Sequence, residues 1–520
     1  MINGETGQPL AALLEDVPGL TVCADAGGTH IRGIVYDSRG AAPGYLFCAL
    51  TGIHTDGHAY IAQAVKAGAA AILCGRPPAE ELPGVVYILA RDARAAMSRI
   101  SANFYGRPCS RLKIIGVTGT DGKSSTVSFI SQLLEAAGKK TGLLSTVSVL
   151  AGGQMEKNTL RQSTPEAPVI HAMLAQMQAA GREFAVIEAT SHGLSPRTGR
   201  LLDVEFDAAV LTNVTHEHLE FHGSLRQYLS DKTNLFRGLD ARRSARKGIP
   251  AFGVANADDS SYAYIKGQTR EKLFSYSLQN AAADVYAADL ACDMSGSSFI
   301  LHDGGRREQI HICLPGAFNV ENVLAAAAAA SRILGICAAD LAPHIEKLQG
   351  VRGRMTPVSG PEAPFHVLVD YAHTPGSFER LFPMVKSYTR GKIIAVFGSG
   401  GERDREKRPL QGEIAARYAG LIILADEDPR GEDPRALLLD IAKGSGRQEG
   451  EGLLIIPDRR EAIAKAYELA QPGDTVLLLG KGHESSIIGK DGPVPWDEIA
   501  TAKELLDSQA GPYPALSATG

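Results

Sequence analysis

The sequence has few of the features that mark secreted, membrane-bound or nucleic-acid-binding proteins. Its 520 residues include only seven cysteines, an odd number with no Cys-x-x-Cys pair, which fits no disulfide framework and favours a reducing cytoplasm. The longest apolar stretch, residues 323–336, is too short to cross a membrane and is interrupted by Arg332. A net charge of −5 implies no polyanionic partner. We therefore expect a cytoplasmic protein whose partners include neither a membrane nor a nucleic acid.

Glycine and proline divide the chain at two places. The string YGRPCS at 105–110 precedes a strand-like run at 112–117, and GVRGRMTP at 350–357 precedes another at 365–369. A chain of this length is too long for a single hydrophobic core. We predict three domains, over residues 1–108, 109–350 and 351–520.

Short apolar runs alternate with helical patterns in the second and third segments, and the runs end in polar or glycine-rich loops. The expected strands cover 113–117, 184–188, 208–213, 393–397, 421–424 and 475–479. Such alternation is typical of parallel sheets, which bind ligands at the carboxyl ends of their strands. We predict an α/β protein with its binding residues at those ends.

The string GVTGTDGKSST at 116–126 lies between an expected strand and an expected helix at 124–137. Glycines let backbone N–H groups approach phosphate oxygens, and a helix N-terminus adds partial positive charge. Lys123 is expected to reach the β- and γ-phosphates, and the Ser124 hydroxyl to ligate Mg²⁺. The spacing departs from a strict Walker A motif, because Val117 stands five residues before Gly122. An ordinary turn is the alternative, but the flanking strand and helix favour a nucleotide site.

The string GTDGKSS resembles the GT-x-GK-[ST]-[ST] nucleotide loop of the Mur ligases and folylpolyglutamate synthases. The resemblance implies a small N-terminal uridine-nucleotide domain, a central P-loop-type ATPase domain with a mainly parallel sheet, and a C-terminal Rossmann-like α/β domain. It also implies ATP and Mg²⁺ as cofactors. The residues expected to hold ATP in this loop are Gly119, Thr120, Gly122, Lys123, Ser124 and Ser125.

A second polar cluster lies in VIEATSHGL at 186–194 and LTNVTHEHLEFHGSLRQYLSDKTNLF at 211–236. Taken alone, this tract is as consistent with a solvated loop as with a metal site, and the lack of zinc-like Cys spacing favours a hard cation. The resemblance implies that Glu188 and His218 bind Mg²⁺, and that Lys232, in a Tyr-x-x-x-Lys pattern, is carbamoylated and holds a second metal. A carbamate supplies an anionic oxygen where an ammonium repels Mg²⁺. The expected catalytic residues are therefore Lys123, Glu188, His218 and Lys232.

Further segments match the same family. GAFNVENVLAA at 316–326 resembles its adenine-side segment, which implies base contacts for Asn319 and Asn322, three residues apart on one helix face. The segments VRGRM and VDYAHTP imply nucleotide contacts for Arg354 and Asp370, the latter on the ribose. VYDSRG, from residue 35, resembles the uridine domain of the MurE-type enzymes and implies a substrate contact for Ser38, although Asp-Ser-Arg is also a common turn. The matching positions for the muramoyl-dipeptide are Ser163, Thr164, Thr190 and Arg200.

Three segments of the third domain imply an amino-acid site: GSGGERDREKRP at 398–409, ADEDPRGEDP at 425–434 and GKGHE at 480–484. By resemblance, the contacts to the incoming amino acid come from Arg403, Asp428, Arg430, Gly480 and Glu484. An arginine binds a carboxylate bidentately, and Glu484 suits a distal ammonium. Arg430 favours meso-diaminopimelate, whereas Asp428, where diaminopimelate ligases usually have Asn, favours L-lysine or L-ornithine. We expect meso-diaminopimelate.

The resemblance implies an ATP-dependent ligase that adds the third residue to UDP-N-acetylmuramoyl-L-alanyl-D-glutamate through an acyl phosphate, in peptidoglycan precursor synthesis. Domain three is expected to close on domain two and exclude water. One alternative is the ligase of the next step, which adds D-Ala-D-Ala; GKGHE and the Asp-Pro-Arg segment count against it. Another is a nucleotide-binding regulatory protein without ligase turnover, which the Lys232 pattern disfavours. The expected partners are the UDP-N-acetylmuramoyl-dipeptide and a diamino acid, and the expected state is a monomer.

Overall fold

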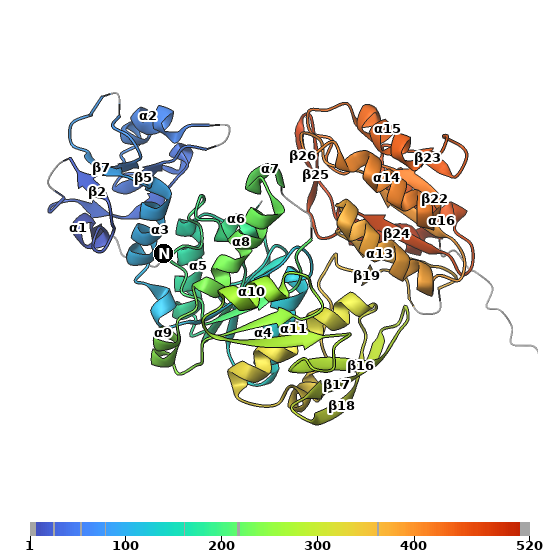
Figure 1. The fold of residues 1–520 in the computed structure, drawn as a ribbon. Helices are drawn as coiled ribbons and strands as arrows, with labels where there is room; N and C mark the ends of the chain where they lie inside the picture. Colours follow the sequence, from blue (N-terminus) through green and yellow to red (C-terminus); the bar gives the residue numbers. More distant parts are fainter. Residues whose placement is uncertain are drawn as a thin grey trace, which may run out of the picture. The chain divides into compact units, whose positions relative to one another are not determined.

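The computed structural model describes residues 7–23, 26–52, 55–78, 80–160, 162–215, 219–360 and 363–509, which form two compact units. The first unit comprises the described residues up to Ala288 together with Ile300–Ile310 and Glu321–Ile345. The second comprises Asp289–Phe299, His311–Val320 and the described residues from Glu346 onward. Three main sheets give a three-domain α/β fold (Figure 1). The predicted fold class is confirmed, and the boundaries at 108/109 and 350/351 stay predictions.

The N-terminal domain contains a five-stranded sheet in the order β2-β7-β6-β5-β4. Its strands are β2 (Leu20–Val22), β4 (Gly33–Val35), β5 (Tyr45–Ala49), β6 (Ala71–Cys74) and β7 (Val86–Ala90), and all but β2 run parallel. Successive residues of β5 point to opposite faces of the sheet. Leu46 and Cys48 join one core with α3 (Ala93–Phe104), while Phe47 and Ala49 join another with α2 (Ile61–Lys66). Helices therefore cover both faces.

The central sheet has the order β11-β10-β9-β12-β8-β13-β14-β15-β16-β17-β18. Its strands are β8 (Lys113–Thr118), β9 (Thr141–Leu144), β10 (Ser148–Leu150), β11 (Glu156–Lys157), β12 (Phe184–Glu188), β13 (Ala208–Leu211), β14 (Phe252–Asn256), β15 (Lys272–Ser277), β16 (Val285–Cys292), β17 (Ser297–Asp303) and β18 (Arg306–Ile312). The run from β9 to β16 is parallel, and β10 and β11 add antiparallel pairs at one edge. The carboxyl ends of the neighbours β12, β8 and β13 consequently lie side by side.

The longer helices of this domain are α4 (Lys123–Ala136), α5 (Ala167–Ala179), α8 (Leu225–Arg237) and α11 (Ala317–Leu334), and short ones include α6 (Ser191–Leu194), α7 (Leu219–His222), α9 (Ala241–Arg246), α10 (Tyr262–Gln268) and α12 (Ala342–Ile345). The alanines at 325–330 in α11 are fully buried, because their small side chains allow close packing. Among the described residues, no single helix has the length and apolar character to cross a membrane; only Ala317–Leu334 and Ala338–Ile345, bent by 106°, meet those criteria as a pair.

The N-terminal domain is fastened to the central domain through α3, which packs against α5. Arg99 Nε donates to Asp203 Oδ1 at 2.5 Å, and the backbone N–H of Asp203 donates to Ser98 Oγ at 3.3 Å. The Asp203 side chain is only 8% exposed. A partly buried, charge-assisted contact of this kind helps to fix how the two domains meet.

The C-terminal domain contains a six-stranded sheet in the order β19-β20-β24-β21-β22-β23. Its strands are β19 (Thr356–Pro357), β20 (His366–Asp370), β21 (Ile393–Phe397), β22 (Ala419–Leu424), β23 (Leu453–Ile455) and β24 (Thr475–Leu479), and all but β19 run parallel. Residues of β21 alternate between two cores. Ala395 and Phe397 pack with α13 (Pro375–Tyr388), α14 (Lys407–Tyr418) and α15 (Pro434–Ser445), and Ile394 and Val396 pack with α16 (Arg459–Leu469) and α17 (Glu498–Gln509). A hairpin of β25 (Ser486–Gly489) and β26 (Gly492–Pro495) follows β24.

Candidate active site

The phosphate loop, residues 119–122, joins β8 to α4 and needs glycine at both ends. Gly119 has φ +152°, and a Cβ there would lie 1.8 Å from Thr212 Oγ1. Gly122 has φ +81°, and a Cβ there would lie 2.2 Å from Asn322 Oδ1. Thr212 Oγ1 also donates to the carbonyl of Asp121 at 2.6 Å. The end of β13 and the start of α11 therefore hold the loop in one conformation.

Inside the loop, Thr120 is bound from several directions. Its N–H donates to the carbonyl of Asn213 at 2.8 Å, and its hydroxyl accepts from the N–H of Thr215 at 2.9 Å and lies 3.1 Å from the hydroxyl of Tyr228. Lys123 Nζ donates to the Thr120 carbonyl at 2.7 Å. The Lys123 ammonium is thus held over the loop that the sequence predicts to bind phosphate.

Three of the residues predicted to be catalytic gather around this loop. Glu188 ends β12, and its Oε2 accepts from Ser124 Oγ at 2.9 Å and from the N–H of Thr146 at 2.8 Å. Lys232 on α8 is 1% exposed; its Nζ donates to the carbonyl of Gly119 at 2.6 Å and lies 4.3 Å from the centre of the Tyr228 ring. The Ser124 hydroxyl, the Glu188 carboxylate and the Lys232 amine therefore all lie beside the phosphate loop. Ser125 is buried in the first turn of α4.

His218, the fourth residue predicted to be catalytic, lies outside the described residues. Among those that are described, no group of three or more His, Cys, Asp or Glu side chains is arranged to hold a metal. Near it in sequence, His222 is buried: its Nδ1 lies 2.7 Å from Asp231 Oδ2 and its Nε2 lies 3.0 Å from Ser191 Oγ. This histidine of α7 joins α8 to α6, so the helix that carries Lys232 is anchored to the helix that Thr190 caps.

The two asparagines predicted to contact the base lie near the start of α11, and both are buried. Asn322 Oδ1 accepts from Thr126 Oγ1 at 3.3 Å and contacts the phosphate loop at Gly122. Asn319 Nδ2 donates to the carbonyl of Pro315 at 2.8 Å. Asn322 therefore contacts the phosphate loop, whereas the side-chain amide of Asn319 stabilises the start of α11.

The residues predicted to hold the muramoyl-dipeptide form a connected group at the end of β12. Thr190 Oγ1 donates to Thr164 Oγ1 at 2.9 Å, and Thr164 Oγ1 donates to the carbonyl of Glu188 at 3.1 Å. Arg200 Nη1 donates to the Thr164 carbonyl at 3.1 Å, and its guanidinium binds Glu166 Oε1 through Nε and Nη2. Thr190 and Arg200 thus both contact Thr164.

The N-terminal domain reaches the same group. Arg94 of α3 lies 3.5 Å from Glu166 Oε2. Burial and the negative charge of Glu166 raise the pKa of Tyr36, and Arg200 opposes them. Tyr36 precedes the turn that contains Ser38, whose Oγ donates to Gln63 Oε1 at 3.2 Å. The predicted uridine turn therefore lies close to the predicted dipeptide residues. Ser163, next to Thr164, is half-buried.

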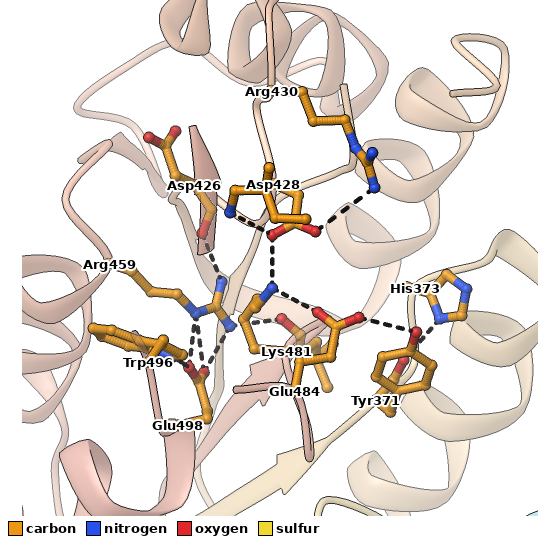
Figure 2. Close-up of polar contacts among 12 residues, drawn as sticks. Tyr371, His373, Asp426, Asp428, Arg430, Arg459, Lys481, Glu484, Trp496 and Glu498 are labelled. Atoms are coloured by element: carbon orange, nitrogen blue, oxygen red, sulfur yellow. Dashed lines mark hydrogen bonds and ion pairs between the residues drawn. The ribbon is translucent and has the colours of Figure 1, made fainter. Parts of the chain in front are cut away.

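In the C-terminal domain, the amino-acid segments converge at the ends of neighbouring strands (Figure 2). Lys481 Nζ donates to Asp428 Oδ1 at 2.8 Å and to Glu484 Oε2 at 2.6 Å. Arg430 Nη2 lies 4.0 Å from Asp428 Oδ2. Burial raises the pKa of Glu484, and Lys481 opposes this rise. Gly480 has φ +97°, and a Cβ there would lie 2.7 Å from Glu427 Oε2.

A cavity of about 530 Å³ lies beside this group, and its lining includes Asp426, Arg430, Glu432, Ile487, Lys490 and Val494. Burial raises the pKa of Asp426 to about 6. The hydrogen bonds from Arg408 lower the pKa of Glu432 to about 2. Arg403, which the sequence also predicts to contact the amino acid, is exposed on the loop after β21.

The remaining predicted nucleotide residues are part of the same domain. The Asp370 carboxylate accepts from the N–H groups of Met355 and Ala372, both at 2.7 Å. The Arg354 guanidinium lies over the ring of Tyr371, 4.7 Å from its centre, and its Nε is buried without a hydrogen-bond partner among the described residues. The structure shows how Asp370 fixes its own loop; its contact to a ribose stays a prediction.

Sequence reasoning missed several side chains that shape this site. Lys481 lies within the GKGHE segment, for which the resemblance implies contacts only from Gly480 and Glu484. Arg459 and Glu498 form a fully buried pair, and Arg459 also donates to the carbonyls of Leu479 and Asp426 at the ends of β24 and β22 (Figure 2). These two residues are 39 positions apart, so no local pattern signals their contact.

Comparison with known proteins agrees with the resemblance drawn from the sequence. The family models "Mur ligase family, catalytic domain", "Mur ligase middle domain" and "Mur ligase, glutamate ligase domain" match residues 30–105, 117–330 and 353–482. The UDP-N-acetylmuramyl-tripeptide synthetase of Roseiflexus sp. (strain RS-1) is 48% identical over 92% of this chain and 94% of its own length, and that of Treponema denticola is 47% identical over 92% of each. A solved UDP-N-acetylmuramoyl-L-alanyl-D-glutamate–2,6-diaminopimelate ligase is 30% identical, covers 94% of this chain and 97% of its own, and superimposes with a TM-score of 0.63. The chain therefore belongs to the Mur ligase family, among the MurE-type UDP-N-acetylmuramyl-tripeptide synthetases, which are ATP-dependent acid–amino-acid ligases of peptidoglycan synthesis.

Proposed function

We propose that this protein joins meso-diaminopimelate, in preference to L-lysine or L-ornithine, to UDP-N-acetylmuramoyl-L-alanyl-D-glutamate. The names of the relatives at 48% and 47% identity leave the third residue open, whereas the solved structure at 30% identity is named as a diaminopimelate ligase. The choice of amino acid therefore rests on the side chains of the C-terminal domain.

The observation that carries this choice is the state of Arg430. Its Nε is buried and has no hydrogen-bond partner among the described residues, and its nearest acid, Asp428, is 4.0 Å away. The guanidinium thus keeps donors for a carboxylate. Asp428 should repel a substrate carboxylate less than its charge suggests, because its Oδ1 already accepts from Lys481 Nζ and from the N–H of Ile488. Only diaminopimelate, of the three candidates, has a second carboxylate for Arg430.

An ammonium group of the amino acid needs an anionic partner, and we assign this role to Glu484. Its Oε2 binds Lys481 and its Oε1 accepts from the Tyr371 hydroxyl at 3.3 Å, so the carboxylate is held in place. Burial raises its pKa, and a substrate ammonium beside it would lower that pKa again. Arg430 and Glu484 together would thus recognise one carboxylate and one ammonium.

The oxygen ligands beside the phosphate loop fit Mg²⁺. The Ser124 hydroxyl and the Glu188 carboxylate lie at hydrogen-bond distance from each other, and Mg²⁺ prefers such oxygen ligands. His218, outside the described residues, remains a further proposed ligand. When bound, Mg²⁺ would neutralise charge on the phosphates. We also propose that the neutral Lys232 amine takes up CO₂ and loses a proton to become a carbamate, supported by the burial of its Nζ against the loop at Gly119.

The proposed reaction has two steps. An oxygen of the glutamyl carboxylate attacks the γ-phosphorus of ATP, and ADP leaves with the electron pair of the broken P–O bond. The amine of the diamino acid then attacks the acyl carbon, the nitrogen loses a proton, and phosphate leaves as the amide forms. Lys123 would hold the phosphates during the first step, and Thr164, Thr190 and Arg200 would keep the dipeptide in line with them.

The test is amide formation by the purified protein with ATP, Mg²⁺, the UDP-muramoyl-dipeptide and each of the three diamino acids, with the product mass determined. We expect the diaminopimelate product to dominate, and Lys123→Met to abolish it. Lys140→Met, an exposed lysine beyond the end of α4, is the matched control and should retain activity. A preference for lysine or ornithine would overturn the amino-acid assignment, and no amide with any of them would overturn the proposed reaction.

A further inference from the structure

Lys481 is the one cation in the described residues that bridges two side chains proposed to bind the amino acid. It follows Gly480 at the carboxyl end of β24, and its side chain is fully buried. Its Nζ lies 2.8 Å from Asp428 Oδ1 and 2.6 Å from Glu484 Oε2 (Figure 2). We propose that Lys481 determines the specificity of the amino-acid site, by neutralising Asp428 so that a substrate carboxylate can approach Arg430.

Burial explains why the ion pairs of Lys481 with Asp428 and Glu484 are strong. A buried ammonium needs anionic partners, and a buried carboxylate needs a donor, so Lys481 stabilises the charge of both carboxylates and offsets the repulsion between them. The partners come from distant parts of the chain, since Asp428 and Lys481 are 53 positions apart. Asp428 is also fixed by its backbone, because the N–H of Gly401 donates to its carbonyl at 2.8 Å. Its side chain has a second anchor, because the N–H of Ile488 donates to Oδ1 at 3.0 Å, so one hydrogen bond still holds the carboxylate in the site if Lys481 is removed.

The charges predict the effect on selectivity. Asp428 and Glu484 carry two negative charges, and Lys481 and Arg430 carry two positive ones, so the four side chains are balanced. Diaminopimelate has two carboxylates and two ammonium groups and is neutral overall, whereas lysine carries one net positive charge. Loss of the Lys481 charge leaves the site negative, which weakens binding of a carboxylate and favours a cation. Glu427, which acts on Glu484 as a further negative charge, is the same with and without Lys481, so the direction of the change is unaffected.

The inference rests on the proposed function for the location of the amino-acid site, but not on which amino acid the natural protein prefers. The decisive quantity is the ratio of kcat/KM for meso-diaminopimelate to kcat/KM for L-lysine. In Lys481→Met we expect this ratio to fall by about tenfold or more, as expected for one charge a few ångströms from the substrate at an intermediate dielectric constant. A purely structural role for Lys481 would lower both values together and leave the ratio unchanged.

The matched control is Lys465→Met. Lys465 also pairs with a glutamate three residues later, Glu468 at 2.9 Å, but on an exposed surface of the same domain. We expect the ratio in this variant to equal that of the natural protein. A ratio in Lys481→Met within twofold of the control would overturn the inference.

A second variant decides the question if Lys481→Met does not fold. Asp428→Asn keeps an oxygen that can accept from Lys481 and Ile488, and it leaves Lys481 paired with Glu484. We expect its ratio to rise, because one negative charge near Arg430 is gone; an unchanged or lower ratio would count against the role of Lys481 as counter-charge. If the natural protein prefers lysine, the amino-acid assignment fails, while the direction of these two changes still tests Lys481.

Discussion

Replacing Gly122 by alanine tests how tightly the phosphate loop is built. At φ +81° any residue with a Cβ is strained by about 1–2 kcal/mol. The new methyl group would also lie 2.2 Å from Asn322 Oδ1, so the amide must move and give up its hydrogen bond from Thr126. A lost hydrogen bond costs about 1 kcal/mol and a displaced rotamer about 0.5–1.5 kcal/mol. We expect a total near 3 kcal/mol, concentrated at the start of α4.

Gly138→Ala is the control for backbone strain alone. Gly138 ends the same helix at φ +79°, but a Cβ there meets no atom within 4 Å. We expect amide hydrogen exchange over residues 119–136 to quicken far more in Gly122→Ala than in Gly138→Ala, and ATP affinity, measured by titration calorimetry, to fall only in the former. In the double variant Gly122→Ala, Asn322→Ala the collision is relieved, so the two substitutions should be less than additive. Equal effects of the two glycine substitutions would refute the steric argument.

Two further predictions concern charge. Burial raises the pKa of Asp426 to about 6, so between about pH 4 and 6 the folded protein holds a proton that the unfolded chain has released. The free energy of unfolding therefore falls as pH rises through this window. Asp426→Asn should flatten that part of the profile of melting temperature against pH, and an unchanged slope would contradict the assignment. Glu166→Gln removes the charged partner of Arg200 and should raise KM for the UDP-muramoyl-dipeptide by about tenfold without changing KM for ATP. Glu205→Gln, which loosens an exposed contact to Arg243 at 3.7 Å, is its control, and equal KM values in the two variants would argue against the role of Glu166.

Local features of the fold were predictable because they depend on short stretches of sequence. The strands at 184–188, 393–397 and 475–479 have the predicted bounds, since each is a short, mainly apolar run buried on both faces. The strand predicted at 208–213 ends instead at Leu211. Its last two residues turn to hold the phosphate loop, with Thr212 Oγ1 bound to the Asp121 carbonyl and Asn213 Oδ1 to the Asp121 N–H. The polar residues that marked this site also shortened the strand.

The contacts that arrange the candidate site were not predictable, because they join residues far apart in sequence. Asp428 meets Lys481 across 53 positions, and Arg459 meets Glu498 across 39. A single sequence carries no pattern for such pairs, and a buried lysine in GKGHE looks the same as an exposed one. The edge of the central sheet escaped prediction for another reason. Most residues of β18 are exposed, so no apolar run marks that strand.

Glu188 shows how one residue can serve both halves of the proposed reaction. Its side chain accepts from Ser124 Oγ, on the side of the phosphate loop, while its backbone carbonyl accepts from Thr164 Oγ1, which in turn accepts from Thr190. The proposed nucleotide and dipeptide residues are therefore joined through a single position at the end of β12. Since transfer of a phosphoryl group requires the attacking and leaving oxygens to be in line, a fixed spacing between the two substrates is what catalysis needs here. The rigid end of a strand buried between two parallel neighbours provides that spacing better than a loop.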